Sequence, residues 1–210
     1  MRPGGTKKVS TEFERLTEQT QHRSDLRELL QRADAGHADR VAEVAYAIAL
    51  QLGQTTPQAS AIASAARWHD VGKAIVEQQV LNKPGPLTTD ERLRVNRHVW
   101  FGHTILVSRS TKANELAANV ALLHHEHFDG SGHPFGLRGH ATPLAARIAS
   151  VADVFDALLT ERPYKRAWSK SETIRYIQAE RERQFDPACV DALIAITETD
   201  RRFFEMKPAA

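Results

Sequence analysis

Residues 36–53 read GHADRVAEVAYAIALQLG, and this stretch decides the class of fold. Its apolar side chains recur three and four residues apart, the spacing of one helix face; they are Val41, Val44, Ala45, Ile48, Ala49 and Leu52. Gly53 follows directly and is a typical helix stop. The stretch therefore predicts an amphipathic helix with one buried face, and His37 stands where this helix begins.

Helical spacing recurs along the chain, and strand-like alternation is absent from the sequence. The predicted helices cover residues 13–31, 56–70, 88–106, 114–125, 143–160, 169–184 and 187–196. Thr88 and Glu91 have the spacing of a capping box, which marks a helix start. Aromatic residues make up only 7% of the chain, and alanine and leucine dominate the apolar set. Because this composition favours helix over sheet, we expect an all-α bundle without a significant sheet.

Composition excludes several classes of protein. The net charge of +2 gives no electrostatic case for binding DNA or RNA. The single cysteine, Cys189, excludes an intramolecular disulfide and a thiolate zinc cluster, and it fits a reducing compartment. No apolar run approaches ~18 residues, and the N-terminus has no secretory core, so no membrane segment is expected. The chain, 41% hydrophobic over 210 residues, is therefore expected to be a cytoplasmic single domain.

A metal-binding pattern appears at His69 and Asp70, which adjoin the predicted end of an apolar helix. An imidazole with a carboxylate suits a divalent transition metal, and Lys73 close by suits a phosphate oxygen. Further candidates lie on other predicted helices: His37, His98, His124, His125 and Asp153. Taken singly, such residues are more often helix caps, surface groups or ion-pair partners. Asp153, for example, has Arg147 and Arg162 as candidate partners.

Taken together, the candidates have the composition of a two-metal site. Two metals about 3.5–4 Å apart need many ligands and a carboxylate that bridges them. Histidines and aspartates on at least four predicted helices are such a set. Periodicity alone does not show that these side chains converge.

The order and spacing of the motifs resemble the HD-GYP subgroup of the HD-domain metal-dependent phosphohydrolases. The matching strings are HADRV, WHDVGK, LNKPGPLT, HVWFGHTIL, HHEHFDGSGHPFGL, RIASVADVFDALLTERPYK and FDPACV. They span roughly residues 34–196. The resemblance implies a helical bundle that holds two or three metal ions, often iron or manganese. It also implies hydrolysis of the bacterial messenger cyclic di-GMP to linear pGpG or to GMP.

The resemblance assigns roles to particular residues. The implied metal ligands are His37, His69, Asp70, His98, His124, His125 and Asp153. Asp70 bridges the metals, and Lys73 contacts the phosphate whose bond is cleaved. Arg162 and Lys165 hold the phosphate or guanine groups of the substrate. Glu126 is expected to orient a ligand imidazole.

The sequence departs from the family pattern at two places. The Gly-Tyr-Pro tripeptide is here Gly132-His133-Pro134, in a loop expected to form one wall of the substrate cleft. Because histidine is smaller and titrates near neutrality, His133 bears on substrate affinity and partner choice more than on metal binding. Where trinuclear relatives have a glutamate, this chain has Ala33, which offers no ligand atom. We therefore predict two metal ions, with iron or manganese as the metals that the resemblance implies. In the family such a centre tends to go with cleavage that stops at pGpG; the sequence leaves open whether the product is pGpG or GMP.

The expected organisation follows from these assignments. Residues 1–12 are a flexible tail, 13–31 an N-terminal helix, 32–200 the catalytic domain and 201–210 a C-terminal tail. The expected partners are a cyclic dinucleotide substrate and, through residues 129–137, diguanylate cyclases or other signalling proteins. The oligomeric state is left open.

Two alternative functions remain at this point. The first is an HD phosphohydrolase for another cyclic dinucleotide, such as cyclic GMP-AMP, because His133 alters the loop. The second is a non-catalytic HD-GYP module that binds partners. The presence of all seven ligand positions argues against the second alternative.

Overall fold

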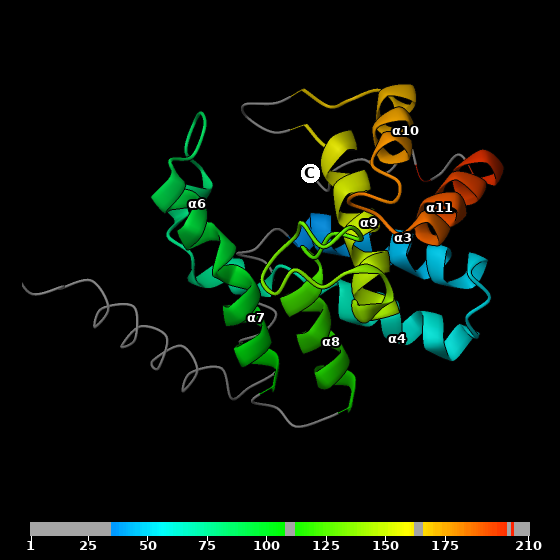
Figure 1. The fold of residues 1–210 in the computed structure, drawn as a ribbon, viewed down its shortest axis with the longest axis horizontal. Helices are drawn as coiled ribbons and strands as arrows, with labels where there is room; N and C mark the ends of the chain where they lie inside the picture. The colour runs from blue at the N-terminus through cyan, green and yellow to red at the C-terminus, as the bar shows by residue number, and fades with distance from the viewer. Residues whose placement is uncertain (1–34, 108–111, 162–165, 201–202, 204–210) are drawn as a thin grey trace, which may run out of the picture.

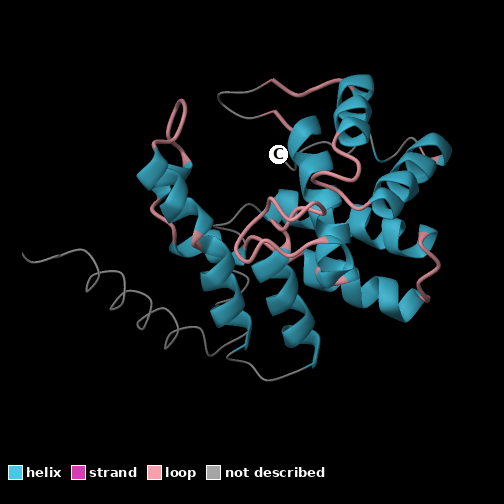
Figure 2. Ribbon diagram, viewed as in Figure 1, coloured by secondary structure: helices cyan, strands magenta, loops and turns pink. Residues whose placement is uncertain are grey.

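The computed structural model describes residues 35–107, 112–161, 166–200 and 203, and the regular elements in them are helical (Figures 1 and 2). Within these ranges no strand forms, and extended pairing is limited to two isolated bridges, Asp129 with Arg138 and Arg181 with Phe185. The all-α prediction is therefore confirmed. Residues 1–12 and 13–31 and most of 201–210 lie outside the described residues, so the domain boundaries stay predictions.

The elements follow one another along the chain in Figure 1. They are α3 (Ala35–Gln51), α4 (Thr56–Ala66), the 3-10 helix η1 (Val71–Ile75), α5 (Gln78–Leu81), α6 (Thr89–Asn96), α7 (His98–Val107), α8 (Lys112–Leu123), η2 (Gly139–Ala141), α9 (Leu144–Leu159), α10 (Lys170–Ala179) and α11 (Pro187–Thr199). The sequence did not predict η1, α5 and η2, because elements of three to five residues are too short to show a helical period.

Helix α3 packs against α4, α9 and α11. Its predicted apolar face is buried, with Val41, Ala45 and Ile48 at zero exposure. Burying a side chain such as Val or Ile stabilises the fold by about 1.5–3 kcal/mol. Gly53 takes a φ of +79° just after the helix, a conformation that favours glycine. Among the described helices, none is long and apolar enough to cross a bilayer.

The predicted helices 56–70 and 88–106 do not run as far as expected, and a histidine follows each end. The predicted helix 114–125 likewise ends as α8 at Leu123, directly before His124. Helix α4 stops at Ala66, so His69 and Asp70 lie in the turn beyond it. The predicted helix 88–106 is interrupted at Arg97 and becomes α6 and α7. Its start is as predicted, with Thr88 and Glu91 forming the capping box.

A side-chain hydrogen bond accompanies each of the two interruptions. His69 Nδ1 lies 2.8 Å from the carbonyl oxygen of Ala66. His98 Nδ1 lies 2.7 Å from the carbonyl oxygen of Val95. Each ring therefore uses a carbonyl group that a continuing helix would give to a backbone amide.

The C-terminal helices also differ in length from the prediction. Helix α10 ends at Ala179, because the chain then turns through Glu182, which has a φ of +67°. Helix α11 continues to Thr199, beyond the predicted end at Ile196.

Two glycines allow η1 to lie directly against α7. A Cβ atom at Gly72 would overlap the carbonyl oxygen of His98 and the amide nitrogen of Gly102. A Cβ atom at Gly102 would lie 3.4 Å from the amide nitrogen of Gly72. The structure shows that Gly72 permits close backbone packing between the turn of Asp70 and the helix of His98.

Candidate metal centre

The structure brings together the seven side chains that the sequence predicts as metal ligands. Their ligand atoms form three groups within which every pair lies within 4.8 Å: His37, His69 and Asp70; His98, His124 and His125; and His69, His124 and Asp153. They come from α3, the turn after α4, α7, the turn after α8, and α9. All are buried except His125 and Asp153, which are partly exposed.

Three of the imidazoles are held in one orientation by helix carbonyl groups. His69 and His98 bond through Nδ1 as described above, and His124 Nδ1 lies 3.1 Å from the carbonyl oxygens of Val120 and Ala121. Because a carbonyl oxygen only accepts, each Nδ1 carries a proton, and in its neutral form each ring has its lone pair on Nε2. The three Nε2 atoms are buried and make no hydrogen bond to any described residue.

Asp70 lies between two sets of imidazoles and presents a different oxygen to each. Its Oδ2 is 3.3 Å from His69 Nε2 and pairs with Lys73. Its Oδ1 is 3.3 Å from His98 Nε2 and 3.8 Å from His124 Nε2. A carboxylate placed in this way has the geometry to bridge two cations.

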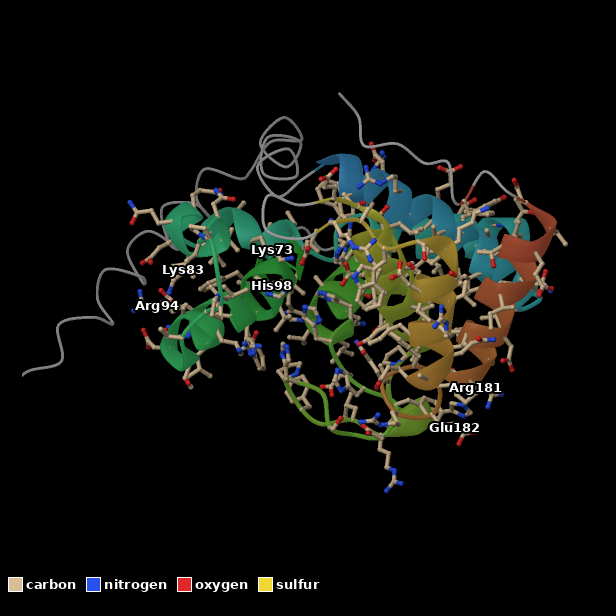
Figure 3. All side chains as sticks on the ribbon, turned by 90° about the horizontal axis from the view of Figure 1, so that it is seen from above. Lys73, Lys83, Arg94, His98, Arg181 and Glu182 are labelled. Atoms are coloured by element: carbon tan, nitrogen blue, oxygen red, sulfur yellow. The ribbon has the colours of Figure 1, made fainter. Side chains whose placement is uncertain are left out.

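Asp153 lies on the other side of the cluster, next to α3. Its Oδ1 lies 3.1 Å from His37 Nε2 and 3.7 Å from His69 Nε2. The ring of His125 completes the opposite side, with its centroid 5.1 Å from that of His98 and 4.0 Å from that of His124. Figure 3 shows His98 and Lys73 on this face of the bundle, apart from Arg181 and Glu182.

Both carboxyl groups of the cluster are ionised. Burial raises the pKa of Asp70, but the Lys73 ammonium and the His69 ring outweigh burial, and the pKa falls well below its usual value. Burial also raises the pKa of Asp153, but the neighbouring rings of His37 and His69 outweigh burial and bring the pKa well below its usual value. The cluster therefore offers two anionic ligands at pH 7.

The imidazoles of the cluster differ in the direction in which their pKa is shifted. Burial lowers the pKa of His98 to about 4 and of His125 to about 3, and it brings the pKa of His124 well below its usual value. These rings are neutral at pH 7, the form that binds metal. Burial also lowers the pKa of His69, but the Asp70 and Asp153 carboxylates outweigh it and raise the pKa to about 10. His37 likewise has a raised pKa, because its bonds to Asp153 and Asp156 outweigh burial.

The donors fit a pair of divalent transition ions. Imidazole nitrogens and carboxylate oxygens suit Fe, Mn, Ni or Zn. The inward Nε2 atoms of His69, His98 and His124 and the Oδ1 atom of Asp70 are buried polar atoms without a hydrogen bond to any described residue. Such atoms are costly to bury unless they bind something. The C-terminal ends of α4, α6 and α8 also lie next to the cluster, and the partial negative charge of a helix C-terminus favours a cation.

The sequence matches a known family over most of its length. A family model for the HD domain matches residues 9–189. The chain belongs to the HD-domain family. The resemblance drawn from the motifs is thereby confirmed, and the helical bundle is the fold that the family implies.

Individual relatives of this HD domain are known. Over 156 residues, 74% of this chain and 41% of the relative, the chain is 47% identical to the cyclic di-GMP phosphodiesterase response regulator RpfG of Xanthomonas campestris pv. campestris. Over 78% of this chain and 31% of the relative, it is 36% identical to the 3'3'-cGAMP-specific phosphodiesterase 2 of Vibrio cholerae. The chain thus spans less than half the length of these curated relatives.

A solved structure supports the fold. The chain superposes on an HDG"Y"P protein from Bdellovibrio bacteriovorus with a TM-score of 0.65. The match covers 90% of this chain and 63% of that protein, at 16% sequence identity. At this identity the likeness shows the fold alone.

The HD domain contains two buried residues at its metal cluster that the sequence did not predict. Asp156 Oδ2 accepts a hydrogen bond from His37 Nδ1 at 2.6 Å. Arg40 donates to the same carboxylate through Nε at 2.6 Å and through Nη2 at 3.0 Å. The sequence spacing could have revealed both residues. Arg40 lies one helical turn after His37, and Asp156 lies one helical turn after Asp153. Arg147, one of the candidate partners of Asp153, pairs instead with Asp186.

Glu126 has a different role from the predicted one. Its Oε1 accepts the amide of Phe135 at 2.7 Å, and its Oε2 accepts the amide of Leu137 at 2.9 Å. The carboxylate is buried and holds the backbone of the loop that follows the histidines. Within the described residues, no hydrogen bond between Glu126 and an imidazole is found. The prediction that it orients a ligand imidazole was therefore wrong.

The loop of residues 129–137 lies beside the cluster. His133 is half-buried, and its ring centroid is 5.0 Å from that of His125 at an interplanar angle of 33°. Burial lowers the pKa of His133, although Glu126 opposes this, so the ring is neutral at pH 7. Gly132 allows the approach, because a Cβ atom there would overlap the backbone of residues 125–127.

Of the other residues predicted to contact the substrate, the structure describes only Lys73. Lys73 pairs with Asp70 and is partly exposed. Arg162, Lys165 and Ala33 lie outside the described residues.

Proposed function

We propose that this HD domain is a metal-dependent phosphodiesterase that hydrolyses cyclic di-GMP to linear pGpG. The observation that carries the proposal is the placement of Asp70 between two sets of imidazoles, in a chain 47% identical to a protein named a cyclic di-GMP phosphodiesterase. In the reaction, water adds across one phosphodiester bond and leaves a 5′-phosphate and a 3′-hydroxyl. We propose the seven clustered side chains as the ligands.

The proposed centre would take two ions, iron or manganese, with Asp70 available to both. His37, His69 and Asp153 would hold one ion, and His98, His124 and His125 would hold the other. Two ions rather than three are proposed because Ala33 offers no ligand atom at the position where trinuclear relatives have a glutamate. When bound, such ions lower the pKa of water and neutralise charge on the phosphate.

The remaining chemistry belongs to side chains beside the centre. Lys73, already next to Asp70 and partly exposed, would donate to a non-bridging phosphate oxygen. Arg162 and Lys165 would bind the second phosphate or a guanine edge, for which the fork of an arginine is suited. Gly132 and His133 would form the wall of the substrate site. His133 in the position of a tyrosine removes a hydroxyl group but keeps a flat ring beside His125.

Location and partners follow from this activity. Because cyclic di-GMP is an intracellular messenger, we propose a cytoplasmic protein. The loop of residues 129–137 is the surface we propose for diguanylate cyclases or other signalling proteins. Neither DNA nor RNA is expected to bind at a net charge of +2.

The test is a product assay on protein purified anaerobically and loaded with iron(II) or manganese(II). Cyclic di-GMP, cyclic GMP-AMP and cyclic di-AMP are supplied separately, and products are separated by chromatography. We expect metal-dependent formation of pGpG from cyclic di-GMP, with slower reaction of the other two. Preference for cyclic GMP-AMP would favour the activity named for the Vibrio cholerae relative. Bound metal without any product would favour a binding module.

A further inference from the structure

Both nitrogen atoms of the His37 ring face a carboxylate of α9. His37 Nε2 faces Asp153 at 3.1 Å, and Nδ1 faces Asp156 at 2.6 Å. Asp153 and Asp156 lie one turn apart on α9, and His37 and Arg40 lie one turn apart on α3. The packing of these two helices therefore fixes the ring at both ends.

Asp156 differs from Asp153 in being neutralised by an arginine. Arg40 holds both oxygens of Asp156, at 2.6 Å and 3.0 Å, and its Nη2 also reaches Thr160 Oγ1 at 3.3 Å. Arg40 and Asp156 are 7% and 5% exposed, so the pair is shielded from water. A carboxylate that accepts three hydrogen bonds from charged or ring donors has little capacity left for a metal ion.

We infer that Asp156, held by Arg40, is a positioning residue for His37 and sets the affinity of the metal position that His37 occupies. Because the carboxylate of Asp156 accepts from Nδ1, it keeps the proton there and leaves the lone pair of Nε2 for the metal. His69, His98 and His124 receive the same support from backbone carbonyls, whereas His37 receives it from a side chain. His37 is therefore the imidazole of this set whose support can be removed by substitution. The inference rests on the proposed metal centre.

The experiment compares Asp156→Asn with the unaltered protein by titrating manganese(II) into metal-free protein and measuring both binding steps by calorimetry. Asparagine keeps the size of the side chain but loses the charge and one of the two acceptor oxygens, so it cannot accept from both Arg40 and His37 Nδ1 as the carboxylate does. We expect one of the two steps to weaken by about 10–100-fold and the other to change little. Arg40→Lys should weaken the same step by less, because it keeps the charge and loses the fork.

The matched control is Asp186→Asn. Asp186 is also buried and also paired with an arginine, Arg147, but it lies at the start of α11 rather than beside an imidazole of the cluster. We expect this variant to lose thermal stability and to keep both manganese affinities. Thermal unfolding of the metal-free proteins identifies any variant that does not fold. If Asp156→Asn is unfolded, the result for Arg40→Lys decides.

The outcomes separate the inference from the proposed function. If the unaltered protein binds no manganese, the proposed metal centre is wrong, and the inference falls with it. If the unaltered protein binds two ions and folded Asp156→Asn binds both with the same affinities, the positioning role is refuted and the metal centre stands. Equal weakening by Asp156→Asn and Asp186→Asn would also overturn the inference, because it would mean a general loss of stability.

Discussion

At the scale of the residue, one hydrogen-bond pattern recurs in the cluster. His69, His98 and His124 each bond through Nδ1 to the carbonyl of the residue three positions earlier. The sequence identified these histidines from their motifs. It could not predict the direction of the rings, because that direction depends on where each helix ends. Asp156 was missed because a buried aspartate one turn after another is also typical of an ordinary ion pair.

Asp70 is the residue whose loss should be most damaging. Asp70→Ala removes both oxygens that face the two sets of imidazoles, so we expect loss of metal and of activity together. Metal content after gel filtration and pGpG formation are the measurements. Asp191→Ala, which removes an exposed carboxylate paired with Arg181, is the control and should change neither. Full activity in Asp70→Ala would contradict the mechanism.

Lys73 should separate metal binding from turnover. Lys73→Ala leaves all seven proposed ligands in place, so metal content should stay unchanged. The loss of a cation near the phosphate should slow turnover by about 100-fold or more. Lys83→Ala removes a lysine that pairs with Glu91 elsewhere on the chain and serves as the control, at full rate (Figure 3). An equal loss of metal and rate in Lys73→Ala would instead mean that the lysine stabilises the centre.

Glu126 should affect substrate binding without affecting metal. Glu126→Gln keeps one acceptor oxygen but loses one of the two bonds to the amides of Phe135 and Leu137. The loop that carries His133 should then be less ordered, which raises KM and leaves metal content unchanged. Steady-state kinetics of cyclic di-GMP hydrolysis measure the change, with Asp191→Asn, an exposed carboxylate outside this loop that pairs with Arg181, as a control. An unchanged KM would mean that the loop that carries His133 does not contribute to substrate binding.

At the scale of the element, periodicity predicted the major helices of the described residues and missed their interruptions. Val41, Ala45 and Ile48 show why: a buried apolar stripe is visible in the sequence. The break at Arg97 leaves no such trace, since the residues around it remain compatible with a helix. It coincides with a side-chain bond at His98 that only the folded chain makes. Gly72 likewise reveals its role only when α7 lies against it.

The contact of η1 with α7 gives a prediction for the two glycines. Gly72→Ala places a Cβ atom onto the backbone of α7, so we expect a loss of about 1–3 kcal/mol in the free energy of unfolding. Metal affinity should fall too, because the turn of Asp70 is displaced. Gly102→Ala should cost less, since its Cβ atom would meet Ala121 Cβ at 3.2 Å and η1 at a longer distance. Denaturant unfolding of both variants measures the two losses in free energy. A larger loss in Gly102→Ala than in Gly72→Ala would refute this role for Gly72.

At the scale of the whole molecule, the bundle brings residues 37, 69–70, 98, 124–125 and 153 to one place. Motif order predicted the set, but spacing along the chain could not show convergence, which depends on how α3, α7, α8 and α9 pack. The same packing places Arg40 and Asp156 behind His37 and leaves Lys73 partly exposed at the cluster. The number of ions bound and the reaction catalysed therefore depend on side chains from several packed helices, not on any single helix.

The most direct test of the central claim is the rate of pGpG formation from cyclic di-GMP, measured as manganese(II) is added in known equivalents to metal-free protein. Because Asp70 is proposed to be shared by two ions, we expect little product with the first equivalent and full turnover only with the second. Full turnover without added metal, or with a single equivalent per chain, would contradict the two-metal centre.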